Sequence, residues 1–83
     1  LVNRVVPADK LMDEANALAA RLASAAPLAL ALAKRALNRA LESNLEDALE
    51  FEAQLQSVAG RSADNKEGVA AFVEKRPPEF TGW

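Results

Sequence analysis

Cysteine and histidine are both absent from this chain of 83 residues. Their absence excludes disulfide bonds, thiol catalysis, an imidazole base and zinc sites built from cysteine or histidine. The 3 glycines are scattered along the sequence, so no glycine-rich loop can cradle a phosphate group. The net charge of −2 argues against a nucleic-acid partner. Composition alone indicates a small helical domain and does not identify its function.

The apolar residues are rich in alanine. They make up 51% of the chain, but 19 of them are alanine and only 5% of all residues are aromatic. A chain of this length suffices for one small domain. We expect its core to consist of close-packed alanine and leucine between helices.

No stretch of the sequence is long enough to cross a membrane. The longest uncharged run, residues 22–33, has 12 residues and is broken by Pro27, whereas a bilayer span needs roughly 20. The N-terminal residues lack the basic flank and apolar core of a signal peptide. We therefore expect no membrane partner, and residence in the bacterial cytoplasm or in an organelle matrix.

Apolar residues recur at helical spacing over most of the chain. Leu11, Ala15, Leu18 and Leu22 follow one another at intervals of four, three and four, which places them on one helix face. Similar spacing continues in the later segments, whereas residues 1–6 are rich in valine and are stopped by a proline. We predict an all-α fold of three to four amphipathic helices after a short extended N-terminal segment.

Capping and helix-breaking residues set the expected helix limits. The first two helices are predicted from about residue 10 to 25 and from 27 to 41; the third begins after a cap at 43 or 44 and ends at 60, and the fourth begins after a cap at 62 or 64 and ends at 76. Gly60 is expected to end the third helix in a left-handed turn. The other residues expected at helix ends are Asp9, Pro27, Ser43 or Asn44, Ser62 or Asp64, and Pro77.

The C-terminal part of the chain carries two further expectations. Gly68 lies inside the last predicted helix, where glycine is less stable than alanine by about 1 kcal/mol. We therefore expect another group to approach this residue closely. Residues 79–83, after the Pro77–Pro78 pair, are predicted to be extended and loosely held.

Charged residues form two groups that invite a functional interpretation. Glu42, Glu46 and Glu50 lie four residues apart and form a ridge along one helix. A metal or acid–base cluster is possible, but a solvated acidic face near a helix start is favoured by the helix dipole. Lys34, Arg35 and Arg39 are similarly interpreted as solvated cations near a helix C-terminus rather than an anion site. We predict no metal site.

Glu52 differs because it shares a helix face with leucines. A carboxylate on an apolar face requires a partner. We predict a structural ion pair with Lys34 or Arg35 on the neighbouring helix.

Residues 64–80 read DNKEGVAAFVEKRPPEF. This stretch resembles the C-terminal signature of the crotonase superfamily, the enoyl-CoA hydratase/isomerase enzymes, and residues 62–82 are most similar to its phenylacetate-catabolism isomerases. The upstream segments LVNRVVP at residues 1–7 and APLA at residues 26–29 resemble family segments too. The residues that carry the C-terminal likeness are Asp64, Glu67, Gly68, Ala71, Phe72, Glu74, Lys75, Arg76, Pro78 and Phe80.

The resemblance implies that residues 1–83 are a single C-terminal helical oligomerisation and lid domain. The acyl-CoA-binding spiral domain that carries the chemistry in this family is then absent from this chain. The implied reaction is hydration or isomerisation of an acyl-CoA thioester through an enolate held in an oxyanion hole. Coenzyme A enters as part of the substrate, with no separate cofactor. We therefore expect no catalytic residue in this chain and no activity from it alone.

Two residues of the signature correspond to ligand contacts in the family. By resemblance, Lys75 contacts the phosphate or adenine region of coenzyme A, and Phe72 lines the acyl or pantetheine end. The alternatives are that Lys75 is a solvated cation at the helix end and that Phe72 fills the core. The resemblance also implies a trimer-type homo-oligomer in the parent, and we expect a homodimer of the isolated chain.

A second class of function fits the same residues. The alanine and leucine stripes could serve a free-standing helical oligomerisation or interaction module without catalysis. Sequence upstream of residue 1 separates the two interpretations, because an acyl-CoA-binding domain there identifies the enzyme.

Overall fold

Regular structure in the chain is entirely helical, as predicted. The computed structural model describes all residues from 1 to 83 and contains no strand. A short 3-10 turn, Ala8–Lys10, leads into the first of four α-helices. The helices are α1 (Leu11–Ala23), α2 (Pro27–Ala40), α3 (Leu45–Gly60) and α4 (Ala63–Glu74).

Three of the helices begin where local backbone chemistry favours a start. Pro27 occupies the first turn of α2, where its missing N–H is not needed. The side chain of Asn44 accepts a hydrogen bond of 2.9 Å from the backbone N–H of Asp47 and caps α3. The hydroxyl of Ser62 accepts one of 3.0 Å from the N–H of Asn65 and caps α4. The alternatives Ser43 and Asp64 are thus not the caps.

Other predicted boundaries are wrong. Asp9 lies within the 3-10 turn, and α1 has no side-chain cap. Gly60 is the last residue of α3 and is followed by Arg61 in the right-handed region (φ −91°), so α3 does not end in a left-handed turn. The left-handed residue is Lys75 (φ 57°), and it ends α4 two residues before the predicted limit.

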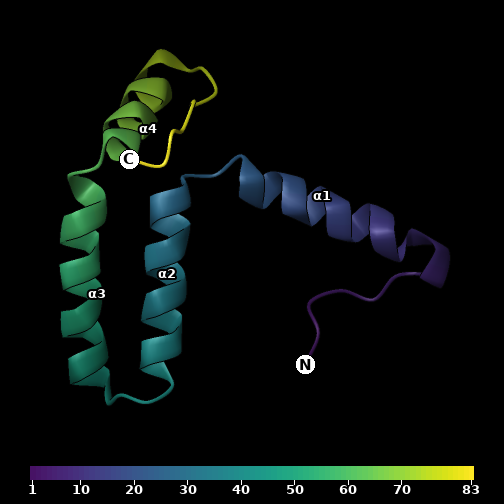
Figure 1. Cartoon of the computed structure of the whole chain (residues 1–83), viewed down its shortest axis with the longest axis horizontal. Coiled ribbons are helices and arrows are strands. Elements are labelled where there is room, and N and C mark those ends of the chain that lie inside the picture. Colours follow the sequence, from purple (N-terminus) through teal and green to yellow (C-terminus); the bar gives the residue numbers. More distant parts are fainter.

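Helices α2 and α3 run side by side in opposite directions, and α4 lies across one end of this hairpin (Figure 1). Leu32 of α2, Leu55 of α3 and Ala71 of α4 are the buried apolar residues. The core is thus made of alanine and leucine, as the composition predicts. It is small, because only 4 of 83 residues are buried.

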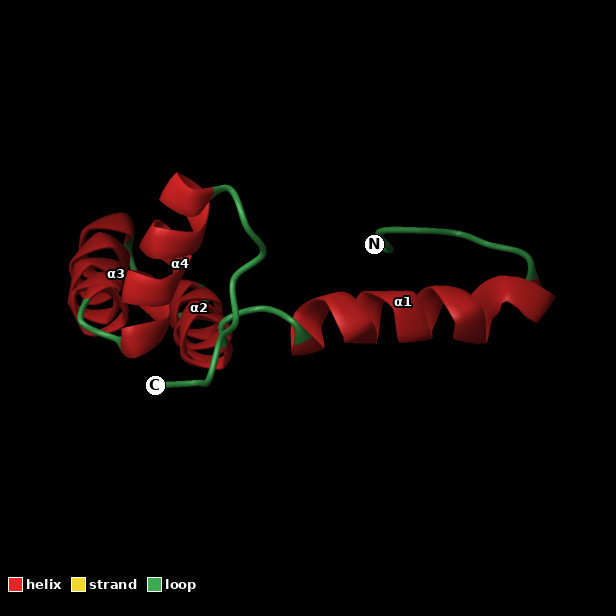
Figure 2. Cartoon of the chain, turned by 90° about the horizontal axis from the view of Figure 1, so that it is seen from above, coloured by secondary structure: helices red, strands yellow, loops and turns green.

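Helix α1 extends away from the other three helices (Figures 1 and 2). The radius of gyration is 16.0 Å, whereas a compact domain of this length has about 12 Å. The preceding residues 1–7 form no strand and run back along α1 (Figure 2), where Arg4 pairs with Glu14. The apolar faces of α1, α2 and α3 are therefore largely uncovered within this chain.

No helix alone is long and apolar enough to cross a membrane. The segments Ala8–Ala23 and Pro27–Ala40 reach the required length and composition only together, and that pair is bent by 108° at the break between them.

Candidate functional site

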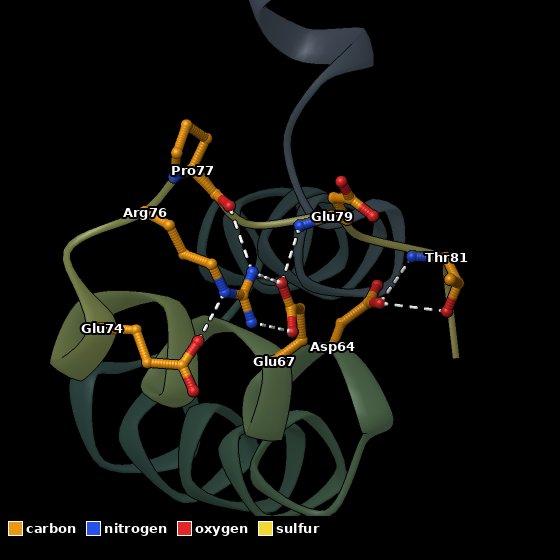
Figure 3. Close-up of polar contacts among 7 residues, drawn as sticks. All are labelled: Asp64, Glu67, Glu74, Arg76, Pro77, Glu79 and Thr81. Carbon is orange, nitrogen blue, oxygen red and sulfur yellow. Dashed lines mark hydrogen bonds and ion pairs between the residues drawn. The ribbon is translucent and has the colours of Figure 1, made fainter.

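The C-terminal tail, residues 77–83, folds back along α4 and is fixed there by Asp64 (Figure 3). The Asp64 carboxylate accepts hydrogen bonds from the backbone N–H groups of Thr81 (2.7 Å) and Gly82 (2.8 Å) and from the Thr81 hydroxyl (3.3 Å). The Asp64 N–H in turn donates to the Trp83 carbonyl at 2.8 Å. Asp64 is only 3% exposed, and a buried carboxylate is stable only with such partners. The prediction of a loosely held tail is therefore wrong.

A second acidic residue of α4, Glu67, binds the guanidinium of Arg76 (Figure 3). Two parallel hydrogen bonds join them, from Nη1 to Oε1 at 2.6 Å and from Nη2 to Oε2 at 2.9 Å. Glu67 also accepts the backbone N–H of Glu79 at 2.9 Å, and Glu74 accepts from Arg76 Nε at 2.6 Å. Such bidentate, charge-assisted pairs are stronger and more directional than single hydrogen bonds.

These contacts shift the titration of both partners. The Arg76 guanidinium, followed by the Glu79 N–H, lowers the pKa of the Glu67 carboxyl to about 2. The hydrogen bonds to Glu67 and then Glu74 raise the pKa of Arg76 above its usual value. Glu67 is thus a very weak base near neutral pH.

Glycines allow the tail to lie close to the helices. The Phe80 ring lies against Gly68, and its nearest carbon is 3.6 Å from where a Cβ on that glycine would be. The predicted close approach to Gly68 is confirmed. Gly82 has a φ of 92° and lies against Pro27 at the start of α2. The tail therefore links α4 to the α1–α2 junction.

Lys75 and Phe72 come together at the end of α4. Lys75 adopts the left-handed conformation (φ 57°, ψ 37°), and its Nζ lies 4.5 Å from the centroid of the Phe72 ring. This distance is typical of a cation–π contact. Phe72 is 73% exposed, so it does not fill the core of this chain.

A groove of about 440 Å³ runs between the adjacent helices α2 and α3, and it is lined mostly by alanine and leucine. Glu52 lines this groove and is exposed. The predicted ion pair between Glu52 and Lys34 or Arg35 is not formed. Arg4 and Arg76 are the only basic residues that form ion pairs in this chain. The carboxylate of Glu52 remains in contact with solvent and so requires no partner.

The remaining charged groups match the solvated interpretation. Lys34, Arg35 and Arg39 are exposed, as are the glutamates of the acidic ridge. No cluster of acidic side chains is arranged to hold a metal ion. The predicted ridge along one helix is incomplete: Glu46 and Glu50 lie on α3, but Glu42 lies in the turn between α2 and α3.

Comparisons with known proteins agree with the sequence resemblance. The sequence profile of the enoyl-CoA hydratase/isomerase family matches residues 1–83. A probable enoyl-CoA hydratase of Mycobacterium tuberculosis is 48% identical over 98% of this chain and 32% of its own length. The 1,2-epoxyphenylacetyl-CoA isomerase of Escherichia coli is 44% identical over 99% of this chain and 31% of its own length.

Solved structures agree as well. The crystal structure of an enoyl-CoA hydratase subunit I from Geobacillus kaustophilus superposes with a TM-score of 0.92 at 46% identity. The alignment covers 99% of this chain and 32% of that protein. The chain thus spans about a third of the length of the relatives it matches. It belongs to the enoyl-CoA hydratase/isomerase, or crotonase, family and corresponds to the C-terminal helical part of that fold.

Proposed function

We propose that the full-length protein hydrates or isomerises an acyl-CoA thioester through an enolate stabilised in an oxyanion hole. The observation that carries this proposal is the match of all 83 residues to the family. Preorganised N–H donors stabilise developing negative charge by some 10²–10³ in rate per donor. The relatives named above include both a hydratase and an isomerase, so the proposal covers both reactions.

We further infer that this segment supplies no catalytic group and instead serves subunit association and closure of the coenzyme A site. Two carboxylates of α4, Asp64 and Glu67, are engaged by main-chain N–H groups, and Glu67 is also bound by Arg76. Because Arg76 and the Glu79 N–H lower the pKa of the Glu67 carboxyl, Glu67 is a poor general base near neutral pH. The uncovered faces of α1, α2 and α3 support packing on the preceding domain and on sister subunits in a trimer-type assembly.

The ligand contacts proposed within this segment are Lys75 and Phe72. The Lys75 ammonium has no carboxylate partner and lies over the exposed Phe72 ring. A cation with only a ring beside it is free to bind a phosphate of coenzyme A. Phe72 provides an apolar surface for the acyl or pantetheine end.

The alternative function is a free-standing helical oligomerisation module without catalysis. The small core and the uncovered leucines favour this alternative, because they require a cover from outside the chain. An activity assay distinguishes the two functions, because an oligomerisation module does not turn over acyl-CoA thioesters, whether alone or within the full-length protein.

The direct test is an assay of crotonyl-CoA hydration and double-bond isomerisation with the full-length protein and with residues 1–83 alone. We expect turnover only by the full-length protein. Absence of turnover by the full-length protein on a panel of acyl-CoA thioesters would favour the oligomerisation module. Turnover by residues 1–83 that depends on one of their carboxylates would contradict the assignment of the chemistry to another domain.

Lys75→Ala in the full-length protein tests the ligand contact. We expect KM for acyl-CoA to rise more than kcat falls, because the coenzyme A carrier is unchanged between ground and transition states. The loss of one charge-assisted contact corresponds to about 1.5–3 kcal/mol. An unchanged KM would show that Lys75 is only a solvated cation.

The proposed substrate also bears on partners and compartment. Coenzyme A is part of the thioester, so we propose no separate cofactor. Relatives include bacterial proteins and one named as mitochondrial, from Dictyostelium discoideum. We accordingly propose the bacterial cytoplasm or an organelle matrix, without a membrane or nucleic-acid partner.

A further inference from the structure

Lys75 adopts a backbone conformation that suits glycine better. It is the one non-glycine residue of the chain with a positive φ, and it stands where helices usually end on glycine. In this conformation the Cβ of every residue except glycine crowds the backbone, and Lys75 carries such a Cβ. An unfavourable conformation of this kind persists only where its surroundings fix it. The groups beside Lys75 therefore require an explanation.

Arg76 fixes the turn through both its backbone and its side chain. Its N–H donates to the carbonyl of the buried Ala71 at 3.1 Å, the long hydrogen bond that closes a Schellman turn. Its guanidinium reaches back along α4 to Glu67 and also binds Glu74 (Figure 3). The residues on either side of Lys75, Glu74 and Arg76, are thus held to each other and to the helix.

The same arrangement decides which partner the Lys75 ammonium meets. Glu67 and Glu74 are the carboxylates of α4 nearest in sequence to the turn, and both bind the Arg76 guanidinium. Lys75 forms no ion pair and has the Phe72 ring as its neighbour. Without Arg76, either carboxylate could attract the ammonium and compete with an anionic ligand.

We propose that Glu67 and Arg76 are positioning residues that hold Lys75 in its left-handed turn and keep its ammonium free for the phosphates of coenzyme A. This inference rests on the proposed ligand role of Lys75. It further states that the Glu67–Arg76 ion pair affects the affinity for coenzyme A only through Lys75. An ion pair that merely stabilised the end of α4 would change stability without any dependence on the lysine.

The test measures the Kd of free coenzyme A by calorimetry and the Tm of the full-length protein for a double-mutant cycle. The cycle consists of Lys75→Gln, Glu67→Gln and the double variant, and Arg76→Lys is added because it keeps the charge but loses the bidentate geometry. Glu46→Gln, an exposed residue of α3, controls for the loss of one negative charge. Asp64→Asn loosens the tail at Thr81 and Gly82 and leaves the Glu67 and Arg76 side chains unchanged, so it controls for a general loosening of the C-terminus.

We expect Lys75→Gln to weaken coenzyme A binding by about tenfold or more, and Glu67→Gln and Arg76→Lys by about 3- to 10-fold. In the Lys75→Gln background, Glu67→Gln should leave Kd unchanged although Tm still falls, because a residue acting through Lys75 has no further effect once the lysine is gone. Glu46→Gln and Asp64→Asn should leave Kd unchanged, and Asp64→Asn should lower Tm.

Two other results are distinguishable. If Lys75→Gln leaves Kd unchanged, the proposed ligand role of Lys75 itself is wrong. If Lys75→Gln weakens binding but Glu67→Gln and Arg76→Lys do not, the positioning role is overturned while the ligand role stands. Equal weakening by Asp64→Asn and Glu67→Gln would overturn the positioning role as well, because it would show a general loosening of the C-terminus.

Discussion

Asp64 at the start of α4 holds the backbone of Thr81, 17 residues later, through a hydrogen bond of 2.7 Å. The same carboxylate binds the N–H of Gly82, and together these contacts set the path of the whole tail. Because Gly82 then lies against Pro27, the start of α4 is connected to the start of α2 through the tail.

Asp64→Ala should release the tail from α4. The change removes a charged acceptor from two backbone N–H groups, and a hydrogen bond to a charged group contributes about 1.5–3 kcal/mol. We expect the amides of Thr81 and Gly82 to lose protection against hydrogen exchange in the full-length protein. Asp13→Ala, at an exposed carboxylate of α1 without a hydrogen-bond partner in this chain, is the control. Unchanged protection in Asp64→Ala would contradict the role of this carboxylate.

The paired Glu67 should make the end of α4 sensitive to acid. Its pKa is lowered from the ordinary 4.5 to about 2 in the folded chain. Since the folded-state value is the lower one, the stabilisation is fully present above about pH 4.5 and is lost as the pH falls towards 2. We expect the Tm of the wild type to fall more steeply with decreasing pH than the Tm of Glu67→Gln across this range. Parallel pH profiles of the two proteins would show that the pair does not contribute.

The features that the sequence predicted correctly depend on neighbouring residues. Pro27, Asn44 and Ser62 begin helices because each acts on backbone groups within the next few residues. Lys75 and Phe72 come from the family resemblance, and their role as ligand contacts stays a prediction. Lys75 follows the last residue of α4 in the left-handed conformation, so the two residues do not share a helix face.

The features that the sequence missed depend on contacts between distant segments. Asp64 and Glu67 are also three residues apart on one face of α4, and this was the available signal for a polar strip that could bind the tail. The backbone N–H groups that these two carboxylates bind belong to Glu79, Thr81 and Gly82, beyond the Pro77–Pro78 pair, and periodicity carries no information on such contacts. The ion pair predicted for Glu52 failed for a related reason: helical spacing placed it on an apolar face, but that face borders an open groove.

Gly68 should tolerate a methyl group but no larger side chain. A Cβ would lie 3.6 Å from the Phe80 ring, an ordinary van der Waals contact, whereas nothing lies within 4 Å of a Cβ at Gly60. We expect Gly68→Ala and Gly60→Ala to raise stability by up to about 1 kcal/mol through helix propensity. Gly68→Leu should displace Phe80 and lower the Tm, while Gly60→Leu should not. Equal effects of the two leucine variants would contradict the packing of Phe80 on Gly68.

Residues 1–83 alone should self-associate, because the chain leaves more apolar surface uncovered than a soluble monomer usually tolerates. Leu18 of α1 is 53% exposed and Leu37 of α2 is 71% exposed, and α1 does not pack on the α2–α3 hairpin. Burial of about 1,000 Å² of apolar surface is worth roughly 25 kcal/mol before the costs of association and ordering. We expect a symmetric homodimer, with a trimer as the second expected form. The short α1–α2 connection is a suitable point for helix exchange between copies.

Sedimentation equilibrium at micromolar concentration measures this association directly. We expect Leu37→Glu to shift the equilibrium towards monomer, because the new charge would have to be buried in the contact. Asn38→Glu places the same charge on the next residue of α2, which is polar already and exposed, and should leave the association unchanged. A monomer of 8.9 kDa that unfolds cooperatively would rule out the dimer. Association that is equally weakened by both substitutions would instead reflect net charge, since only Leu37 lies on the apolar groove between α2 and α3.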